Sequence, residues 1–210
     1  PKEHRFVSSD SDIRSIVCFG GYPEPFKRKD MAGRDRWFGS YIQRLVSHDA
    51  TELAGKGEFA DSLESLLFLM ASQEQSELVK AKIARSLEIS ETALQTYLSL
   101  ARGMFIIDYL NPWGIGYSGR AVRKPKVSLT DSGLASYLAG LTPEKARIVG
   151  GMELFGATLE SFVATELRKQ QTWSSKRFRL FHYRKREEEV DIVIELAGRQ
   201  VILLEVKSAM

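Results

Sequence analysis

Carboxylates and one lysine near the end of the chain have the types and order of a metal-assisted site for phosphodiester cleavage. Asp191 stands in the apolar run at residues 190–194, and Glu205 and Lys207 follow the apolar run at residues 201–204. Because side chains alternate along a strand, Glu205 and Lys207 share one face. Acids that converge repel one another, and a divalent cation such as Mg²⁺ relieves that repulsion because it prefers oxygen ligands.

A third acid, Glu160, lies in a predicted amphipathic helix over residues 154–169. The sequence therefore predicts a Mg²⁺ site with Glu160, Asp191 and Glu205 as its ligands. In such a site the metal lowers the pKa of an attacking water and stabilises the leaving phosphate. Lys207 would orient that water or neutralise charge in the transition state, so these four side chains are the predicted catalytic residues.

A purely structural explanation of the same residues stays open. Glu205 and Lys207 suit an ion pair at the edge of a sheet, and Asp191 has Arg184 and Lys185 as candidate partners. In that case the pattern holds no metal and does no chemistry.

Three strands and one helix must position this group. Residues 179–183, 189–196 and 200–207 are the predicted strands, and the short turn at residues 197–199 makes the last two a hairpin. Together with the preceding helix they form a small α/β unit, for which we expect residues 150–210.

Residues 76–141 have the pattern of a winged helix-turn-helix. A short helix over residues 78–87 is followed by a turn, and Ser90 is a good N-cap for a second helix. Two strand candidates, residues 104–110 and 120–129, flank a glycine-containing loop and complete a hairpin with a long tip.

The basic charge of this region lies on the predicted wing, whereas the exposed face of the second helix is polar and nearly neutral. Nucleic acid is therefore the expected partner, with a solvated loop or a structural connector as the alternatives. Trp113 and Tyr117, near the tip, would stack on bases or pack on the neighbouring helical region. The predicted nucleic-acid-binding residues are Arg102, Arg120, Arg123, Lys124 and Lys126.

The first 75 residues are predicted to be mainly helical. Apolar residues recur at helical spacing over residues 35–53 and 61–72. Cys18, the single cysteine, lies in the apolar run at residues 16–19 and is expected to be a buried small hydrophobe. A linker at residues 141–152 is predicted to separate the winged helix from the C-terminal unit.

Composition limits the class of function. The chain has 210 residues, of which 43% are hydrophobic and 27% charged, and its net charge is +3. This is ordinary for a globular protein, and no apolar run approaches the roughly 20 residues that span a bilayer. We therefore expect a cytoplasmic protein with no membrane partner, and a lone cysteine fits a reducing compartment.

The C-terminal acids have the residue order of the PD-(D/E)XK phosphodiesterase pattern, with Glu160 on a helix, Asp191 on the second strand and Glu205-Val206-Lys207 on the third. Further short segments occur in a specific order along the chain, and the whole set is residues 20–25, 41–49, 123–126, 130–134, 159–163, 189–191 and 205–207. In this order they resemble a large prokaryotic family of AAA-type ATPases with a C-terminal domain of unknown function.

The resemblance implies a nucleotide-binding domain, then a winged helix, then a restriction-endonuclease-like domain. Two features depart from that pattern. The chain has no GxxxxGK[ST] segment, so ATP would bind only through an upstream domain. The chain also stops after the third strand, where nuclease domains of this class continue with a further helix and strand.

The prediction is an α+β fold with an N-terminal helical region (1–75), a winged helix (76–141) and a truncated restriction-endonuclease-like unit (150–210). The expected function is nucleic-acid binding together with a Mg²⁺-dependent nuclease-like unit. One alternative is a non-catalytic module that couples the ATPase to a protein or DNA partner. Another is a plain winged-helix transcription regulator, against which the separate C-terminal unit argues.

Overall fold

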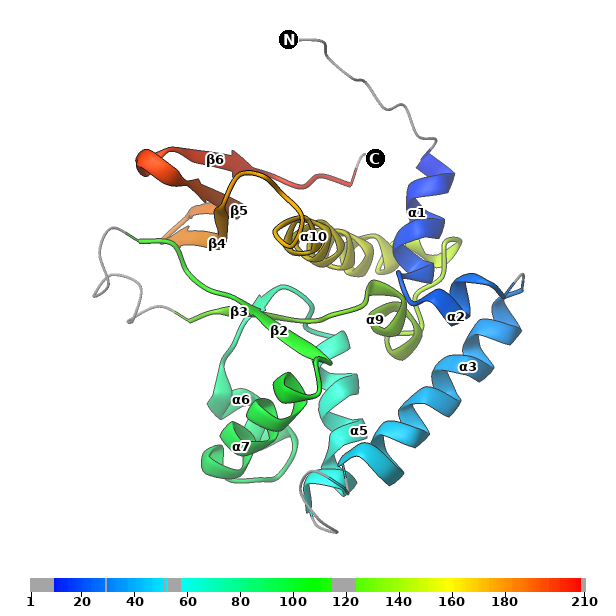
Figure 1. Cartoon of the computed structure of the whole chain (residues 1–210). Coiled ribbons are helices and arrows are strands. Elements are labelled where there is room, and N and C mark those ends of the chain that lie inside the picture. Colours follow the sequence, from blue (N-terminus) through cyan, green and yellow to red (C-terminus); the bar gives the residue numbers. More distant parts are fainter. Residues whose placement is uncertain (1–9, 29, 51, 53–57, 115–123, 209–210) are drawn as a thin grey trace.

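The computed structural model describes residues 10–28, 30–50, 52, 58–114 and 124–208. Over these residues helices surround two three-stranded antiparallel sheets, which confirms the predicted α+β class (Figure 1). The long helix α10 (Gly151–Gln170) crosses the middle of the molecule, between the C-terminal sheet and the winged helix. Among the described helices, none has the length and apolar character needed to cross a membrane.

The N-terminal region is helical, as predicted, but its helices begin earlier than the apolar pattern indicates. Asp30 accepts a hydrogen bond from Gly33 N at 2.6 Å, and this cap starts the third helix at Met31 rather than at residue 35. The elements of this region are α1 (Asp10–Phe19), α2 (Pro23–Phe26), α3 (Met31–Arg44), the π-helix η1 (Leu45–Asp49) and α5 (Glu58–Ala71).

The middle of the chain has the order strand, helix, helix, strand, strand of a winged helix. Ser90 caps the second helix by accepting a hydrogen bond from Ala93 N at 3.1 Å, which confirms its predicted role. The small sheet has the order β1-β3-β2, and its two-residue strand β1 is too short to give an alternation signal in the sequence. The elements are β1 (Ser76–Glu77), α6 (Lys80–Ser86), α7 (Glu91–Gly103), β2 (Ile107–Leu110) and β3 (Lys126–Leu129).

The C-terminal unit is α10 followed by an antiparallel meander with the order β4-β5-β6. The prediction that the third strand reaches residue 207 is wrong, because β6 ends at Leu204. Beyond it, Val206 N donates to the side chain of Asp191 at 2.7 Å and not to a backbone carbonyl of β5. The elements that follow β3 along the chain are α9 (Ser132–Leu138), the 3-10 helix η2 (Lys145–Arg147), α10, β4 (Phe178–Lys185), β5 (Glu188–Leu196), the 3-10 turn η3 (Ala197–Arg199) and β6 (Val201–Leu204).

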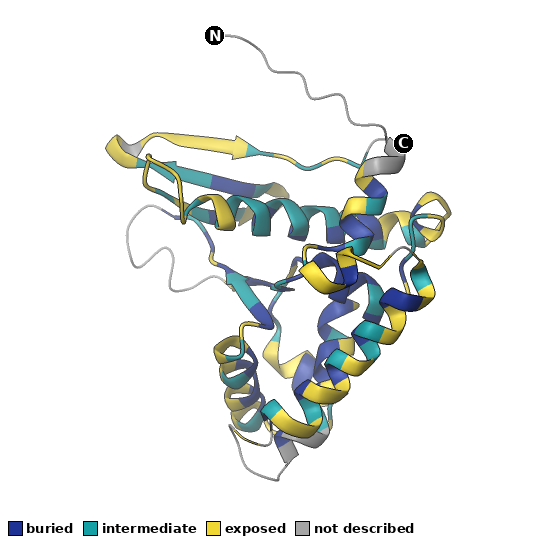
Figure 2. Ribbon diagram, turned by 45° about the vertical axis from the view of Figure 1, so that its right-hand side comes forward, coloured by how far each residue is buried: buried dark blue, intermediate teal, exposed yellow. Residues whose placement is uncertain are grey.

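Two apolar cores join the N-terminal helices to the rest of the chain. The larger one lies where α3, α5, α7 and α9 meet the small sheet, and it includes the fully buried Leu66, Leu94 and Leu134. Figure 2 shows the buried stretches of the chain in dark blue. Each fully buried leucine side chain contributes roughly 2 kcal/mol of transfer free energy. This core therefore holds the helical region and the winged helix as one packed body.

The smaller core contains Val17 and Cys18 of α1, Leu141, Ala146 of η2 and Phe155 of α10. Two residues of the predicted linker at 141–152, Leu141 and Ala146, are buried in this core, whereas Ile148 and Val149 of the same stretch are 60% and 92% exposed. Cys18 is 5% exposed within this core, which confirms that it is a buried small hydrophobe.

The turn after α1 packs tightly on the start of α9. The Asp131 carboxylate accepts hydrogen bonds from Leu134 N at 2.9 Å and from Gly21 N at 2.7 Å. A Cβ atom on Gly133 would lie 2.4 Å from the Phe19 carbonyl oxygen, so the backbone approach needs glycine there. The segments at residues 20–25 and 130–134 are thus in direct contact.

Candidate functional site

Two of the predicted metal ligands lie on elements that pack together, the helix α10 and the strand β5. Glu160 lies on α10 and its side chain is 15% exposed, while Asp191 lies on β5. Burial raises the pKa of Glu160, and the negative charges of Asp191 and Glu189 raise it further. Asp191 is fixed by the backbone N–H of Val206, so Arg184 and Lys185, its expected partners, are not what holds it.

Lys126 of β3 contacts Glu160 and Glu189, which together with Asp191 we call the acidic group. Its Nζ atom lies 2.7 Å from Glu160 Oε1 and 3.0 Å from Glu189 Oε1, and its side chain is 3% exposed. Burial acts to lower the pKa of Lys126, but Glu160 and Glu189 outweigh that effect and raise it. Lys126 is therefore a buried counter-ion, which corrects the prediction that it lies on a nucleic-acid-binding surface.

Glu205 and Lys207 lie apart from Lys126 and Glu160, on the exposed segment that follows β6. Lys207 Nζ lies 2.5 Å from Glu205 Oε1, and their side chains are 74% and 61% exposed. The pair has the form of the structural alternative, an ion pair beside a sheet edge. Its exposure means that it contributes little to stability.

The carboxylates have the donor chemistry that Mg²⁺ prefers, but lysine ammonium groups occupy part of that donor set in this structure. Lys126 takes up an oxygen of Glu160, and Lys207 takes up an oxygen of the exposed Glu205. Within the described part of the chain, no three side chains of the metal-binding types form a group that would hold an ion.

A junction of backbone hydrogen bonds joins the wing to the C-terminal sheet. His182 N of β4 donates to the Asn111 carbonyl at 2.9 Å, and Trp113 N donates to the His182 carbonyl at 2.6 Å. The Trp113 ring packs against Tyr183, with ring centroids 6.1 Å apart. Trp113 thus packs on the C-terminal sheet and not on the helical region, and Tyr117 lies outside the described residues. We call these contacts of Asn111, Trp113 and His182 the wing–sheet junction.

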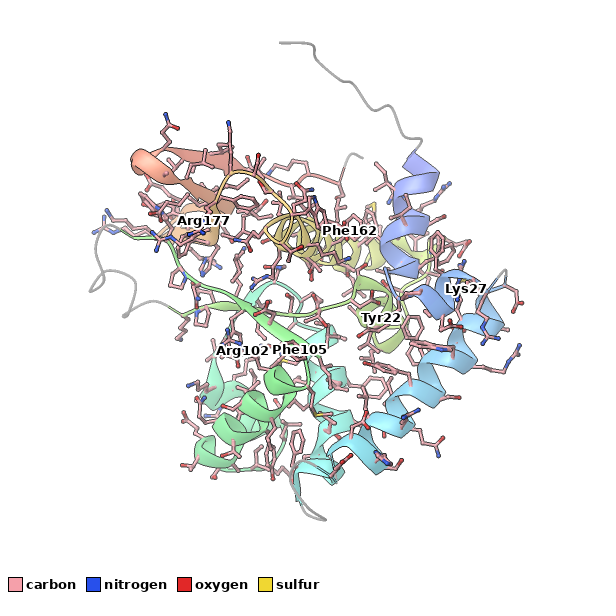
Figure 3. The ribbon with its side chains drawn as sticks, in the orientation of Figure 1. Tyr22, Lys27, Arg102, Phe105, Phe162 and Arg177 are labelled. Carbon is pink, nitrogen blue, oxygen red and sulfur yellow. The ribbon has the colours of Figure 1, made fainter. Side chains whose placement is uncertain are left out.

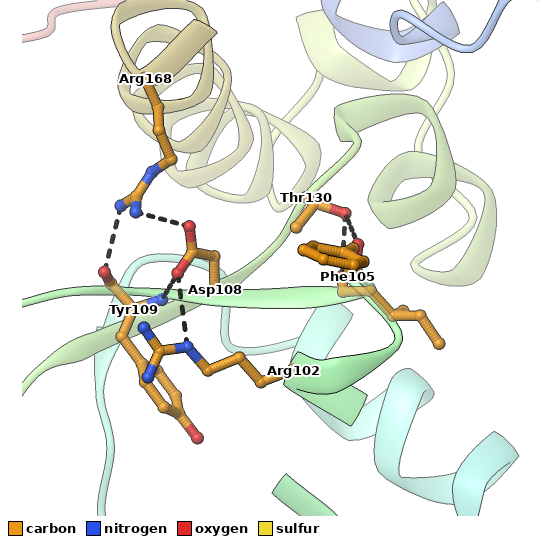
Figure 4. Close-up of polar contacts among 7 residues, drawn as sticks. Arg102, Phe105, Asp108, Tyr109, Thr130 and Arg168 are labelled. Atoms are coloured by element: carbon orange, nitrogen blue, oxygen red, sulfur yellow. Dashed lines mark hydrogen bonds and ion pairs between the residues drawn. The ribbon is translucent and has the colours of Figure 1, made fainter. Parts of the chain in front are cut away.

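A second polar contact connects α10 to β2. Arg168 lies 2.6 Å from an Asp108 carboxylate oxygen and donates to the Tyr109 carbonyl at 3.1 Å (Figure 4). The Arg102 guanidinium lies on the other side of Asp108, at 3.9 Å, and 5.1 Å from the centre of the Tyr109 ring. These contacts hold the winged helix and the C-terminal unit in one orientation.

Three of the exposed cations of the winged helix are Lys80 on α6, Arg102 on α7 and Lys124 at the base of the wing, and Lys82 and Arg85 of α6 are exposed as well. Arg102, with a side chain 56% exposed, lies beside the exposed Phe105 (Figure 3). Lys124 is exposed where the wing returns to β3, whereas Arg120 and Arg123 lie outside the described residues. Sequence reasoning missed Lys80 of α6, whose ammonium donates to Gln95 on the α7 face. Only the packing of α6 on α7 brings that charge there.

Family comparisons place two segments of the chain. Residues 10–145 match the family model described as Domain of unknown function (DUF8612). The chain belongs to this family. Residues 155–210 are similar to a second model, described as Domain of unknown function (DUF4143). The first match covers the helical region and the winged helix, and the second covers most of α10 and the β4–β6 sheet.

Among curated relatives, the chain is 26% identical over 181 residues to an uncharacterized protein of Mycobacterium bovis. It has the same identity, over the same length, to an uncharacterized protein of Mycobacterium tuberculosis. Each alignment covers 86% of this chain and 40% of the relative, so the chain spans about two fifths of their length. No solved structure matches the chain.

Proposed function

We propose that this chain is a nucleic-acid-interaction module of a longer protein. In this proposal the winged helix and the C-terminal unit present one continuous surface, because the wing–sheet junction fixes one against the other. The observation that carries it is the placement of three exposed cations, Lys80, Arg102 and Lys124, around the polar face of α7 and the base of the wing. Cations in this arrangement suit the phosphate backbone of a nucleic acid.

The polar face of α7 favours positioning on the backbone over the reading of base sequence. Ser99 donates to the Gln95 carbonyl at 2.8 Å and Thr96 donates to the Thr92 carbonyl at 3.3 Å. These hydroxyls turn back on their own helix, which leaves few donors aimed outward. We therefore expect binding that depends strongly on salt and weakly on sequence.

The resemblance to AAA-type ATPases indicates which role this module would have in the longer protein. An ATPase elsewhere in the longer protein would bind and hydrolyse ATP, and this chain would connect that cycle to nucleic acid. The greater length of the mycobacterial relatives is compatible with such an arrangement. The C-terminal unit would then serve as the rigid support that aims the wing.

The test is a binding titration by fluorescence anisotropy with labelled duplex DNA, single-stranded DNA and RNA. The double variant Arg102→Glu with Lys124→Glu should weaken binding by at least about tenfold and flatten the dependence of the affinity on salt. The control is Lys27→Glu, because Lys27 is also exposed but lies well away from Arg102, at the end of α2 (Figure 3). If the control weakens binding equally, or if the wild type does not bind, the nucleic-acid proposal is wrong and a protein partner becomes the favoured alternative.

A Mg²⁺-dependent nuclease is the second candidate function. It is favoured by the packing of α10 on β5, through which the negative charge of Asp191 raises the pKa of Glu160, together with the order of the four predicted catalytic residues. The same nucleic acids, incubated with Mg²⁺, Mn²⁺ or EDTA, test it. Metal-dependent cutting that is lost in both Asp191→Ala and Lys207→Ala would support the nuclease, and cutting that survives both would exclude this site.

A further inference from the structure

Lys126 of the winged helix places a buried positive charge beside the acidic group of the C-terminal unit. Lys126 lies at the start of β3, where it pairs with Leu110 of β2 and Glu77 of β1 in the small sheet. Its side chain crosses to α10 and β5, where it contacts Glu160 and Glu189 at 2.7 and 3.0 Å. The backbone of Lys126 thus belongs to the winged helix, whereas its side-chain ammonium pairs with carboxylates of the C-terminal unit.

The energetics of burial make this contact specific. A buried ammonium is strongly destabilising unless carboxylates surround it, and removing one partner of such a group leaves the other charge uncompensated. Glu160 and Glu189, with Asp191 close by, would likewise repel one another without a cation between them. Lys126 and Glu160, whose side chains are 3% and 15% exposed, therefore each need the other for burial, whereas Glu189 is 38% exposed.

The ammonium occupies an oxygen that the sequence pattern assigns to a metal ion. Glu160 is the predicted metal ligand on the helix, and its Oε1 atom is the atom that Lys126 contacts. The remaining charged neighbours are Arg184, 3.9 Å from Glu189, and Lys207, whose ammonium also acts on Asp191. The protein itself supplies positive charge on each side of this acidic group.

We propose that Lys126 is an internal lock, which holds β3 against α10 and β5 and closes the acidic group to external divalent cations. A shift of β3 would withdraw the ammonium and leave Glu160 and Glu189 uncompensated beside Asp191. A divalent cation would then bind there. The proposal rests on the acids of the second candidate function, and it predicts that the wing governs their access to metal.

The experiment measures Mn²⁺ binding by electron paramagnetic resonance, without nucleic acid. Lys126→Met removes the charge and keeps an apolar chain of similar length, and we expect it to bind Mn²⁺ at least about tenfold more tightly than the wild type. Lys126→Arg keeps the charge and should behave as the wild type does. The double variant Lys126→Met with Glu160→Gln should lose the gain.

Two results would overturn the lock: equal Mn²⁺ affinity of the wild type and Lys126→Met, or a gain that survives Glu160→Gln. Circular dichroism checks the fold of each variant. If the Lys126 variants do not fold, the test uses the wild type alone. Mn²⁺ is added, and paramagnetic broadening of the NMR signal of the Val206 amide, which donates to Asp191, is measured. Selective broadening of that resonance in the wild type would contradict the lock. None of these readouts involves nucleic acid or cleavage, so they are separate from the proposed function.

Discussion

Glu74→Gln removes a buried carboxyl group from the contact between the winged helix and α10, and we expect it to stabilise the protein at alkaline pH. Glu74 is 3% exposed and accepts a hydrogen bond from Leu129 N of β3 at 2.8 Å. Burial raises its pKa from 4.5 to about 8, against the opposing hydrogen bond from Leu129. The folded protein therefore holds this proton more tightly than the unfolded chain does.

The sign of the pH dependence follows from that difference. Below the unfolded pKa of 4.5 both states are protonated and Glu74 causes no loss of stability. As the pH rises toward about 8, the unfolded chain releases its proton while the folded protein retains it, so stability falls. The loss amounts to roughly 1.4 kcal/mol per pH unit, which gives about 5 kcal/mol as its upper value above the folded pKa.

The assay is urea unfolding at about pH 5.5, 7 and 8.5, which brackets most of the transition. Gln keeps an oxygen for Leu129 N and offers an amide donor to Ser161, the buried neighbour on α10. Among the described residues, Glu74 Oε2 and Ser161 Oγ have no hydrogen-bond partner, so the amide fits the site. The matched control is Glu64→Gln, at an exposed position of α5.

The stability of Glu74→Gln relative to the wild type should increase steadily from acid to alkaline pH, while that of Glu64→Gln stays flat. A relative stability of Glu74→Gln that does not change across this range would refute the argument. A wild type that becomes more stable relative to Glu74→Gln as the pH rises would also refute it, because a buried acid with a raised pKa lowers the stability of the wild type as the pH rises.

Three further predictions concern contacts between segments far apart in the sequence. Gly133→Ala places a Cβ 2.4 Å from the Phe19 carbonyl oxygen and should lower the free energy of unfolding, measured by urea titration, by about 3 kcal/mol. The control Gly103→Ala has open space around the new Cβ and should change the free energy of unfolding by less than about 1 kcal/mol. Asp131→Ala removes the acceptor for Leu134 N and Gly21 N and should cost about 2 kcal/mol; a loss no larger than that of Gly103→Ala would show that these bonds are replaced by water. Asp108→Asn weakens the contact with Arg168 and should cost about 1 kcal/mol at low salt and less at high salt, and an effect independent of salt would argue against an ionic contribution.

Local signals in the sequence predict much of the fold. Ser90 and the apolar spacing around it define α7, because a cap and an amphipathic face are properties of adjacent residues. The position of Glu160 on a helix and of Asp191 on a strand is predicted for the same reason. The end of β6 is not, because it depends on a bond between Val206 and a side chain on the neighbouring strand.

The sequence by itself determined the α+β class, the helix-turn-helix and the order of the acids along the chain. The tertiary structure alone decided which charges meet. Lys126 and Glu160 are 34 residues apart, and no periodicity relates a wing strand to a helix that follows it. In the sequence Lys126 is one of several wing cations, and in the structure it is the buried partner of Glu160 and Glu189. The physical reason is that burial, which decides whether a charge faces solvent or a carboxylate, depends on how separate elements pack.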